Sequence, residues 1–140
     1  MARLEQVNVV VRDMEAMAAF YQRLGLELRG NQGPWAAHHR NTGTAGGVDF
    51  DLDSTEFASV WDEGWPGGTG VVLGFRVDDR DAVDRTYAEL LATGAVGQQV
   101  PYDAFWGVRY AVVTDPDGNA VGIMSPVDQA RRTTPPAPPP

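Results

Sequence analysis

The chain contains an internal repeat, and this repeat limits the folds that it can adopt. Residues 7–13 read Val-Asn-Val-Val-Val-Arg-Asp and precede a helical pattern of apolar residues, and residues 73–79, Leu-Gly-Phe-Arg-Val-Asp-Asp, precede another. The repeat aligns identical residues, among them Asp13 with Asp79, Tyr21 with Tyr87, and Leu24 with Leu90. An alternating apolar stretch followed by a helical period indicates a strand that leads into a helix. We therefore expect one small α+β unit, used twice.

Length and composition allow one compact domain and exclude several kinds of chemistry. The 140 residues are 43% hydrophobic, which is enough for a core shared by two half-domains. There is no cysteine and all 11 basic residues are arginine, so disulfides, thiolate chemistry and lysine Schiff bases are excluded. The net charge of -8 argues against a nucleic-acid partner. No apolar run is long enough to span a membrane, so we expect a cytoplasmic protein without a membrane partner.

The first half of the chain predicts a βαβββ unit. Residues 4–11 alternate between polar and apolar side chains, as a strand with one covered face does. Asp13 is a suitable helix N-cap, and Gly25 provides a stop after a run of apolar residues at helical spacing. Three further strands are expected, separated by turn-forming residues, at 27–29, 34–40 and 47–53.

The second half predicts the same unit again. A strand is expected at 70–77, then a helix capped by Asp79 and ended by Gly94, then strands near 96–102, 107–114 and 119–125. Glycine, proline and tryptophan between the halves favour an irregular crossing segment. We therefore expect a single domain at 1–127, made of module one at 1–54, the crossing segment at 55–68 and module two at 69–127, and a proline-rich, disordered tail at 128–140.

The motifs resemble those of a known family. Two βαβββ units, two strand-to-helix phrases of the form Val-x-Asp, and the sequence Asp115-Pro116-Asp117-Gly118-Asn119 before the final strand together resemble the vicinal oxygen chelate superfamily of glyoxalases, bleomycin resistance proteins and dioxygenases. The resemblance implies an α+β fold in which the two modules curl a mixed sheet into an open cup. It also implies a homodimer, which in this family usually completes the cup.

The resemblance also gives the positions at which enzymes of this family hold a divalent metal. These positions fall on Gln6, Asp51, Val72 and Gly122. Valine and glycine offer no donor side chain, and one amide with one carboxylate makes a poor metal site. We therefore expect no metal and no other cofactor.

Strand alternation selects the side chains that point into the cup. It turns Gln6, Asn8, Arg76 and Met124 inward, whereas Val7, Val9, Leu73 and Phe75 face the helices. Asp49, Asp51 and Asp53 form a row on one strand face. Three interpretations stay open: a charged edge strand, a network with Arg76 or Arg109 that lines the cup, and a cation site at unusual positions.

Aromatic residues are concentrated before the last hairpin. Tyr102, Phe105 and Trp106 can form a wall on which a flat ligand stacks, with Arg109 pairing an anionic group, or they can bury a dimer contact. Three further tryptophans, Trp35, Trp61 and Trp65, suggest stacking surfaces at a cleft or an interface. His38 and His39 are neighbours on an expected strand, so only one of them can enter the cup.

Two functional hypotheses follow. The first is a metal-free binding protein that holds a planar or aromatic small molecule in the cup, with drug sequestration of the bleomycin-resistance type as the family analogy. The second is a lyase, isomerase or dioxygenase-like enzyme that uses displaced metal ligands, or metal-free acid–base catalysis by Asp49, Asp51 or His38. The expected ligand-binding residues are Gln6, Asn8, Trp35, His38, Asp49, Asp51, Trp61, Trp65, Arg76, Tyr102, Phe105, Trp106, Arg109 and Met124.

Overall fold

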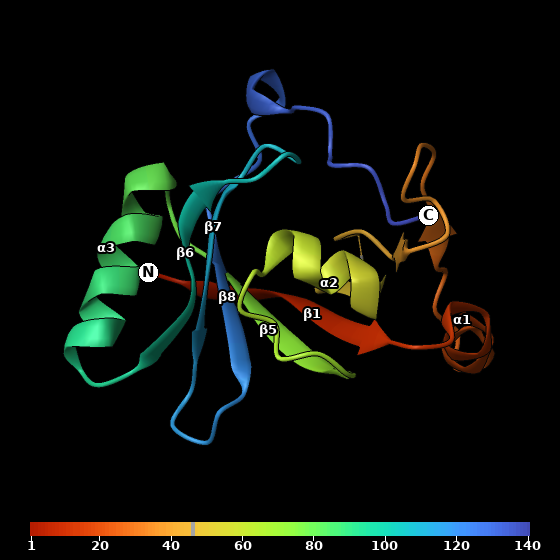
Figure 1. The fold of residues 1–140 in the computed structure, drawn as a ribbon, viewed down its shortest axis with the longest axis horizontal. Helices are drawn as coiled ribbons and strands as arrows, with labels where there is room; N and C mark the ends of the chain where they lie inside the picture. The colour runs from red at the N-terminus through yellow and green to blue at the C-terminus, as the bar shows by residue number, and fades with distance from the viewer. Residues whose placement is uncertain (46) are drawn as a thin grey trace.

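The computed structural model describes residues 1–45 and 47–140, which form one eight-stranded mixed sheet with three α-helices and a short 3-10 helix (Figure 1). The elements are, in chain order, β1 (Arg3–Val11), α1 (Met14–Arg23), β2 (Arg29–Gly30), β3 (His39–Asn41), β4 (Asp49–Ser54), α2 (Thr55–Trp61), β5 (Gly70–Arg76), α3 (Arg80–Ala92), β6 (Val96–Asp103), β7 (Arg109–Thr114), β8 (Ala120–Met124) and η1 (Gln129–Arg131).

The sheet topology confirms the two βαβββ modules. The strand order is β2-β3-β4-β1-β5-β8-β7-β6, so each half of the chain contributes four adjacent strands. The halves join where β1 pairs antiparallel with β5. Within each half the first strand pairs parallel with the last, β1 with β4 and β5 with β8. The fold class and the curved mixed sheet are therefore as expected from the sequence.

The two repeated helices begin and end in the same way. The Asp13 carboxylate accepts a hydrogen bond from the Ala16 N–H at 3.0 Å, and the Asp79 carboxylate accepts one from the Ala82 N–H at 2.8 Å. Each helix is followed by a glycine with a left-handed φ, Gly25 at 101° and Gly94 at 102°, a conformation that glycine adopts without strain. Both expected N-caps are confirmed, and the repeat extends to the chemistry of the helix ends.

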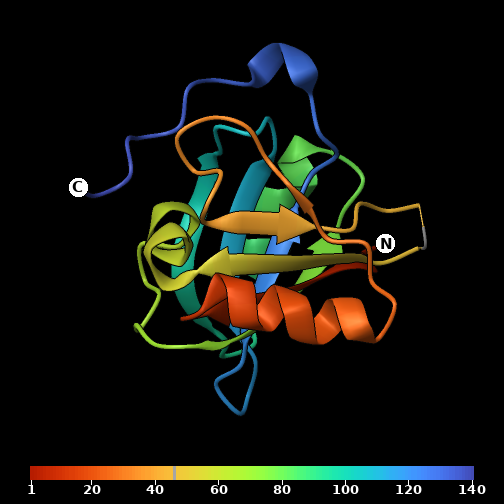
Figure 2. The same ribbon diagram turned by 90° about the vertical axis from the view of Figure 1, so that its right-hand side faces the viewer.

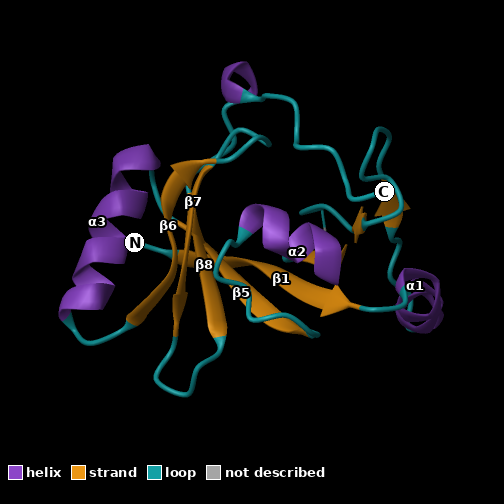
Figure 3. Cartoon of the chain, viewed as in Figure 1, coloured by secondary structure: helices purple, strands orange, loops and turns teal. Residues whose placement is uncertain are grey.

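The helices lie on different sides of the curved sheet. Helix α1 packs on β4 and α3 packs on β6, β7 and β8, outside the cup, whereas α2 contacts β1 and β4 from the inside (Figures 1 and 3). Apolar side chains beneath α1 and beneath α3 form two separate clusters. A third and larger cluster lies inside the cup, and it contains Trp35, Phe57, Trp61 and Tyr110. The concave side is therefore partly filled by aromatic rings.

The middle of the outer sheet face is not covered by a helix. Val71 and Leu73 on β5 are 50% and 37% exposed, although the sequence predicted Leu73 to face a helix. The expectation is wrong because α1 and α3 pack toward the two ends of the sheet and leave the outer side of β5 open.

Two local predictions in the first half are also wrong. Residues 34–38 form turns instead of a strand, and the His38 N–H donates to the Trp35 carbonyl at 2.9 Å. Of the strand expected at 34–40, only the residues of β3 pair with the sheet. The crossing segment begins with a regular helix, α2, whose N-cap is Ser54: its hydroxyl accepts a hydrogen bond from the Phe57 N–H at 3.0 Å. This helix buries Trp61 in the cup, so the segment supplies core.

The residues after β8 pass over the open side of the cup (Figures 1 and 2). The Thr133 N–H donates to the Phe105 carbonyl at 2.9 Å, and the indole N–H of Trp35 donates to the Pro136 carbonyl at 2.7 Å. The sequence predicted a tail without structure. The proline-rich composition indicates extended backbone. It does not indicate that the Phe105 carbonyl and the Trp35 indole N–H bond to the tail.

Candidate functional site

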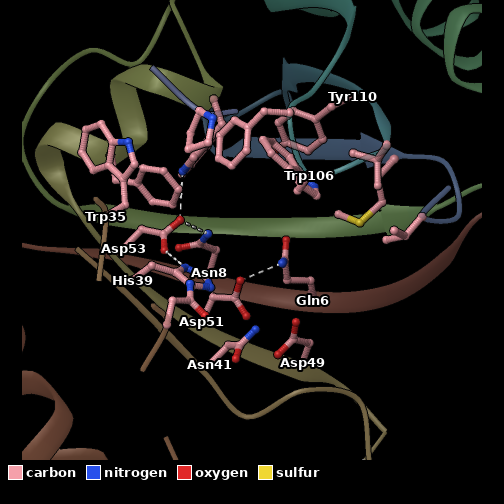
Figure 4. Close-up of a pocket in the computed structure, with 18 of the residues that line it drawn as sticks. Gln6, Asn8, Trp35, His39, Asn41, Asp49, Asp51, Asp53, Trp106 and Tyr110 are labelled. Atoms are coloured by element: carbon pink, nitrogen blue, oxygen red, sulfur yellow. Dashed lines mark hydrogen bonds and ion pairs between the residues drawn. The ribbon is translucent and has the colours of Figure 1, made fainter. Parts of the chain in front are cut away.

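The concave face holds a cavity of about 630 Å³, a size typical of small-molecule sites. The strands of module one supply one side of it. The turn that contains Trp35, helix α2, strand β7 and the segment before β7 supply the other (Figure 4). The first side is polar and comprises Gln6, Asn8, His39, Asn41, Asp49, Asp51 and Asp53; we call these residues the polar floor. The second side is aromatic and comprises Trp35, Phe57, Trp61, Phe105, Trp106 and Tyr110; we call these residues the aromatic wall.

Asp53 is the centre of the hydrogen-bond network in the polar floor. Its side chain is buried, and its Oδ2 atom accepts hydrogen bonds from Asn8 Nδ2 and Trp61 Nε1, both at 2.9 Å. Its Oδ1 atom contacts Nδ1 of His39 (Figure 4). Because both oxygens have partners, burial of this carboxylate is compensated. The bond to Trp61 also ties the polar floor to the aromatic wall.

His39 lies in the cavity with one ring nitrogen held by Asp53. Burial alone would lower the pKa of His39, but the hydrogen bond and charge of Asp53 and the charge of Asp49 outweigh it, and the pKa lies above its ordinary value. Nδ1 is engaged, so the other ring nitrogen, Nε2, is the one left for a ligand. A carboxylate-oriented imidazole of this kind can transfer a proton.

Asp51 is buried, at 4% exposure, and only one of its oxygens has a protein partner. Its Oδ2 atom accepts a hydrogen bond from Gln6 Nε2 at 2.9 Å, and its Oδ1 atom has none. Burial raises the pKa of Asp51 well above its usual range, and the charges of Asp53 and Asp49 and a hydrogen bond shared with the Asp49 carboxyl add to the effect. Two more buried floor atoms, Asn8 Oδ1 and Asp49 Oδ1, also lack a partner among the described residues.

The aromatic wall is a continuous set of packed rings. Trp35 and Phe57 lie 4.9 Å apart between ring centroids, Phe57 and Phe105 lie 6.1 Å apart, and Phe105 and Trp106 lie 5.1 Å apart. Tyr110 continues the wall, 5.5 Å from Trp106. Such rings offer flat, weakly hydrated surface on which a planar molecule can stack.

In module two, side chains fill the space beside Gly122, one of the two family metal positions in this half, and beside Gly74. A Cβ atom on Gly122 would lie 2.6 Å from the hydroxyl oxygen of Tyr110, and one on Gly74 would lie 2.7 Å from Cε of Met124. Both distances are shorter than ordinary Cβ contacts, so the Tyr110 ring or the end of the Met124 side chain would have to move to admit a side chain. Val72, the other family position in this half, is buried in the aromatic cluster. The residues present therefore do not fit the metal centre of the family, and the part of the chain that the structure describes has no group of three or more His, Cys, Asp or Glu side chains arranged to hold a metal.

The structure brings most of the expected ligand-binding residues to this cavity. Those that line it are Gln6, Asn8, Trp35, Asp49, Asp51, Trp61, Arg76, Phe105, Trp106 and Met124. The remaining four lie elsewhere and bond to other groups. His38 contacts the Ser54 hydroxyl at 2.8 Å, Trp65 donates to the Gly68 carbonyl at 3.1 Å, and Tyr102 donates to the Trp61 carbonyl at 2.8 Å.

Arg109 is the fourth, and its position corrects the interpretation of the aspartate row. Its guanidinium pairs with Asp84 at 3.1 Å and with Asp103 at 3.2 Å, and Arg76 pairs with Glu5 at 3.1 Å. No arginine among the described residues pairs with Asp49, Asp51 or Asp53, so the expected arginine network is absent there. The edge-strand interpretation is also wrong, because β4 lies between β3 and β1.

Several cavity residues were not among the expected ligand-binding residues, and His39, Phe57, Tyr110 and Asn41 show why. The sequence predicted one strand over 34–40, and this strand did not show which of His38 and His39 points into the cup. In the structure β3 begins at His39, and His39 is the histidine that lines the cavity. Phe57 was missed with its helix, although Ser54 followed by Glu56 is an N-terminal helix signal. Tyr110 and Asn41 face the cavity because of strand register, which no local pattern reveals.

Sequence comparison assigns the chain to a family. Residues 3–123 match the model of the Glyoxalase/Bleomycin resistance protein/Dioxygenase superfamily, which is most of the chain. The chain belongs to this superfamily. No curated protein sequence matches it. The superfamily resemblance seen in the sequence is therefore confirmed.

Solved structures share the superfamily fold with this chain. A Legionella pneumophila protein described as an NAD-dependent benzaldehyde dehydrogenase is 20% identical, with a TM-score of 0.64 over 86% of this chain and 96% of that one. The Mn(II)-bound glyoxalase from Novosphingobium aromaticivorans is 21% identical, with a TM-score of 0.63 over 96% of this chain and 43% of that one. Methylmalonyl-CoA epimerase from Mycobacterium tuberculosis is 18% identical, with a TM-score of 0.55 over 91% and 89%. At these identities the likeness concerns the fold alone.

The described residues include no helix with both the length and the apolar character of a transmembrane segment.

Proposed function

We propose that this superfamily member is a small-molecule-binding protein that holds a planar or aromatic ligand in its cup without a metal. The observation that carries the proposal is the continuous aromatic wall, which faces a buried polar floor across a cavity of about 630 Å³. A flat ligand between them stacks on the rings and bonds to the floor.

Side-chain packing in module two is the reason why we propose a site without a metal. Tyr110 occupies the space beside Gly122, where one donor side chain would have to lie, and the other family position in this half is Val72, which has no donor atom. In module one, Gln6 already bonds to Asp51. A divalent ion would have to break that bond and would still find donors on one side only.

The proposal includes a homodimer, and the uncovered outer face of β5 supports it. Val71 and Leu73 are large apolar side chains exposed next to each other on this face. Exposed apolar surface of this kind marks contact sites. Light scattering on Leu73→Arg and on the unmodified protein tests this: we expect a dimer that the arginine dissociates, and a monomer in both samples contradicts it.

Titration calorimetry with a matched pair of neutral ligands tests the binding function. We expect 1-naphthylmethanol to bind, and its saturated, non-planar analogue decahydro-1-naphthylmethanol to bind at least about tenfold more weakly, because only the flat ring stacks. The measurement is repeated after dialysis against EDTA, and the affinity should not change. Equal affinity for both alcohols, or loss of binding in EDTA, contradicts the proposal.

Substitutions in the wall show whether the ligand is in the cup. Trp106→Ala should weaken binding of 1-naphthylmethanol about tenfold, whereas Trp106→Phe should retain most of it. Phe20→Ala is the matched control, since Phe20 is a large ring exposed on α1 outside the cup. An equal effect of Phe20→Ala would place the ligand elsewhere.

One observation favours a second candidate function, metal-free acid–base catalysis. His39 and Asp53 form a carboxylate–imidazole pair, and His39 lines the cavity. Such a pair can act as a general base on a bound molecule. His39→Gln separates the two functions: a binding protein retains its ligand affinity and has no turnover to lose, whereas an enzyme retains affinity and loses turnover.

A further inference from the structure

The polar floor presents three buried oxygen atoms to which no N–H or hydroxyl group of the described residues donates: Asn8 Oδ1, Asp49 Oδ1 and Asp51 Oδ1. The carboxyl groups of Asp49 and Asp51 lie close enough to share a hydrogen bond when one of them is protonated. Asn8 and Asp51 are nine-tenths or more buried, at 6% and 4% exposure, and both line the cavity (Figure 4). A buried acceptor without a donor costs about 1–3 kcal/mol, and more when it carries charge. Three together indicate that a donor from outside the protein belongs here.

The three atoms belong to neighbouring residues on one face of the sheet. Asn8 on β1 is the register partner of Asp51 on β4, in strands roughly 4.8 Å apart. Asp49 lies two residues from Asp51 on the same strand, roughly 7 Å away along the chain and on the same face. A single small group can therefore lie among all three residues.

The charge of the floor is not balanced by the protein. The nearby carboxylate of Asp53 is paired with His39 and bonded to Asn8 and Trp61. Asp49 and Asp51 take part in none of the ion pairs found among residues 1–45 and 47–140. Arg76, the cavity-lining arginine of β5, is already paired with Glu5. Among the described residues, His39 is therefore the one cationic group in the floor, and it bonds to Asp53, which leaves Asp49 and Asp51 without an ion-pair partner.

We propose that the cup binds a primary amine as its ammonium ion, with the ammonium on the polar floor and a planar body on the aromatic wall. An ammonium carries three N–H donors, which equals the number of unpartnered acceptors. Its bonds to carboxylates are charge-assisted and stronger than those of a neutral hydroxyl. The proposal rests on the binding function proposed above and adds the chemical class of the ligand.

The aromatic wall favours the same ligand. Trp61 and Trp106 line the cavity opposite the floor, and tryptophan faces attract cations through the ring quadrupole. Trp61 is also fixed in place by its bond to Asp53. An ammonium between them gains attraction from both sides, whereas a carboxylate is repelled by the floor and unfavourable at the ring faces.

Calorimetric titration with three probes that share one ring system tests the proposal. The probes are 1-naphthylmethylamine, 1-naphthylmethanol and 1-naphthoate, each in EDTA-treated buffer at pH 7. We expect the amine to bind about tenfold or more tightly than the alcohol, and the carboxylate to bind most weakly. Equal affinity for amine and alcohol leaves the binding function standing and overturns the ammonium preference. Binding of none of the three overturns both.

Substitutions show whether the preference comes from the floor. Asp51→Asn and Asp49→Asn each replace a carboxyl group with an amide of the same shape, and each should weaken the amine about tenfold while changing the alcohol less than about threefold. Asp117→Asn is the control, because it makes the same replacement on an exposed turn. Loss of amine preference in Asp117→Asn assigns it to net charge and overturns the proposal. Thermal melting of each variant checks that it is folded.

A metal titration tests the competing occupant. Hard divalent ions also bind carboxylate and amide oxygens, so Mn²⁺ is titrated alone and in competition with the amine. We expect no saturable Mn²⁺ binding below millimolar concentration and no effect of EDTA on the amine. Displacement of the amine by Mn²⁺ at micromolar concentration would overturn the proposal.

Discussion

The two modules have the same backbone plan and opposite side chains inside the cup. In module one, β1 pairs with β4 so that Gln6 faces Asp49 and Asn8 faces Asp51. In module two, β5 pairs with β8 in the same parallel register, and the corresponding pairs are Val72 with Ala120 and Gly74 with Gly122. Every one of the four polar positions in the first half is apolar or glycine in the second.

The third strand of each module repeats this contrast. His39 on β3 pairs with Asp53, and the equivalent pair in module two is Tyr110 with Met124. The helix caps, in contrast, are alike, with Asp13 and Asp79 in the same role. The duplication therefore retained what positions the sheet and changed what lines the cup. The result is a site with a polar half and an aromatic half instead of two equivalent halves.

Removing the centre of the polar half should have the largest effect. Asp53→Ala leaves the Asn8 amide, the Trp61 indole N–H and His39 without their shared acceptor. We expect the free energy of unfolding to fall by about 3–5 kcal/mol, measured by chemical denaturation. Asp117→Ala, on the exposed turn, should change it by less than about 0.5 kcal/mol. A similar small loss for Asp53→Ala would show that the network contributes little.

Adding a side chain to the apolar half should conflict with Tyr110. We expect Gly122→Ala to cost about 1–3 kcal/mol, since its Cβ would lie 2.6 Å from the Tyr110 hydroxyl oxygen. A double-mutant cycle tests the cause: in a Tyr110→Ala background the same substitution should cost at least about 1 kcal/mol less. Additive losses would mean that Tyr110 does not close this position.

The His39–Asp53 pair should make stability depend on pH. The pKa of His39 in the folded protein is raised, so its contribution is complete below its unfolded pKa of about 6.5 and declines as pH rises through the folded value. His39→Gln should therefore lose about 1–2 kcal/mol near pH 6 and less near pH 9. A loss that grows with pH would have the wrong sign for this pair.

Substitution of Asp51 should have the smallest effect on stability, and its sign should be opposite to that of His39→Gln. The pKa of Asp51 is raised by burial and by the Asp53 and Asp49 carboxylates, while the groups facing it from β1 and β3, Gln6, Asn8 and Asn41, are neutral. A raised carboxyl pKa means that stability falls as pH rises from its unfolded value of about 3.9 toward the folded one.

Asp51→Asn should consequently stabilise the protein by roughly 1 kcal/mol at neutral pH, with the gain shrinking toward pH 4. Melting curves across this pH range measure it. If Asp51→Asn destabilised the protein equally at all pH values, the Asp51 carboxylate would not be unfavourable in the folded protein.

The helices and most strands could be predicted from the sequence because each depends on residues that are close together in the chain. The Asp13 and Asp79 caps, the glycines after the helices and the alternating strands each have a short-range signal, and the repeat showed that they belong to one unit. Alternation also placed Gln6 and the aspartate row inside the cup. Short-range signals thus identified most residues of the polar floor, but not His39 and Asn41.

Long-range contacts decided the rest of the site. The sequence predicted arginine partners for the row, but Arg109 is taken by Asp84 on α3 and the actual partner, His39, comes from β3. Likewise, the C-terminal residues that pass over the cup are held by a hydrogen bond from the Trp35 indole N–H to the carbonyl of Pro136, far away in the sequence. Pairings between residues so distant in sequence follow from the tertiary fold and leave no local pattern.

The four tryptophan indole N–H groups offer the most direct test of the central claim. In a ¹H–¹⁵N NMR spectrum, with signals assigned by single Trp→Phe substitutions, 1-naphthylmethylamine is added in the presence of EDTA. We expect the signals of Trp61 and Trp106 in the cavity to move most, and that of Trp65, which donates to Gly68 outside it, to move least. No movement of the cavity signals, or movement only after a divalent metal is supplied, would contradict a metal-free cup that binds flat ligands.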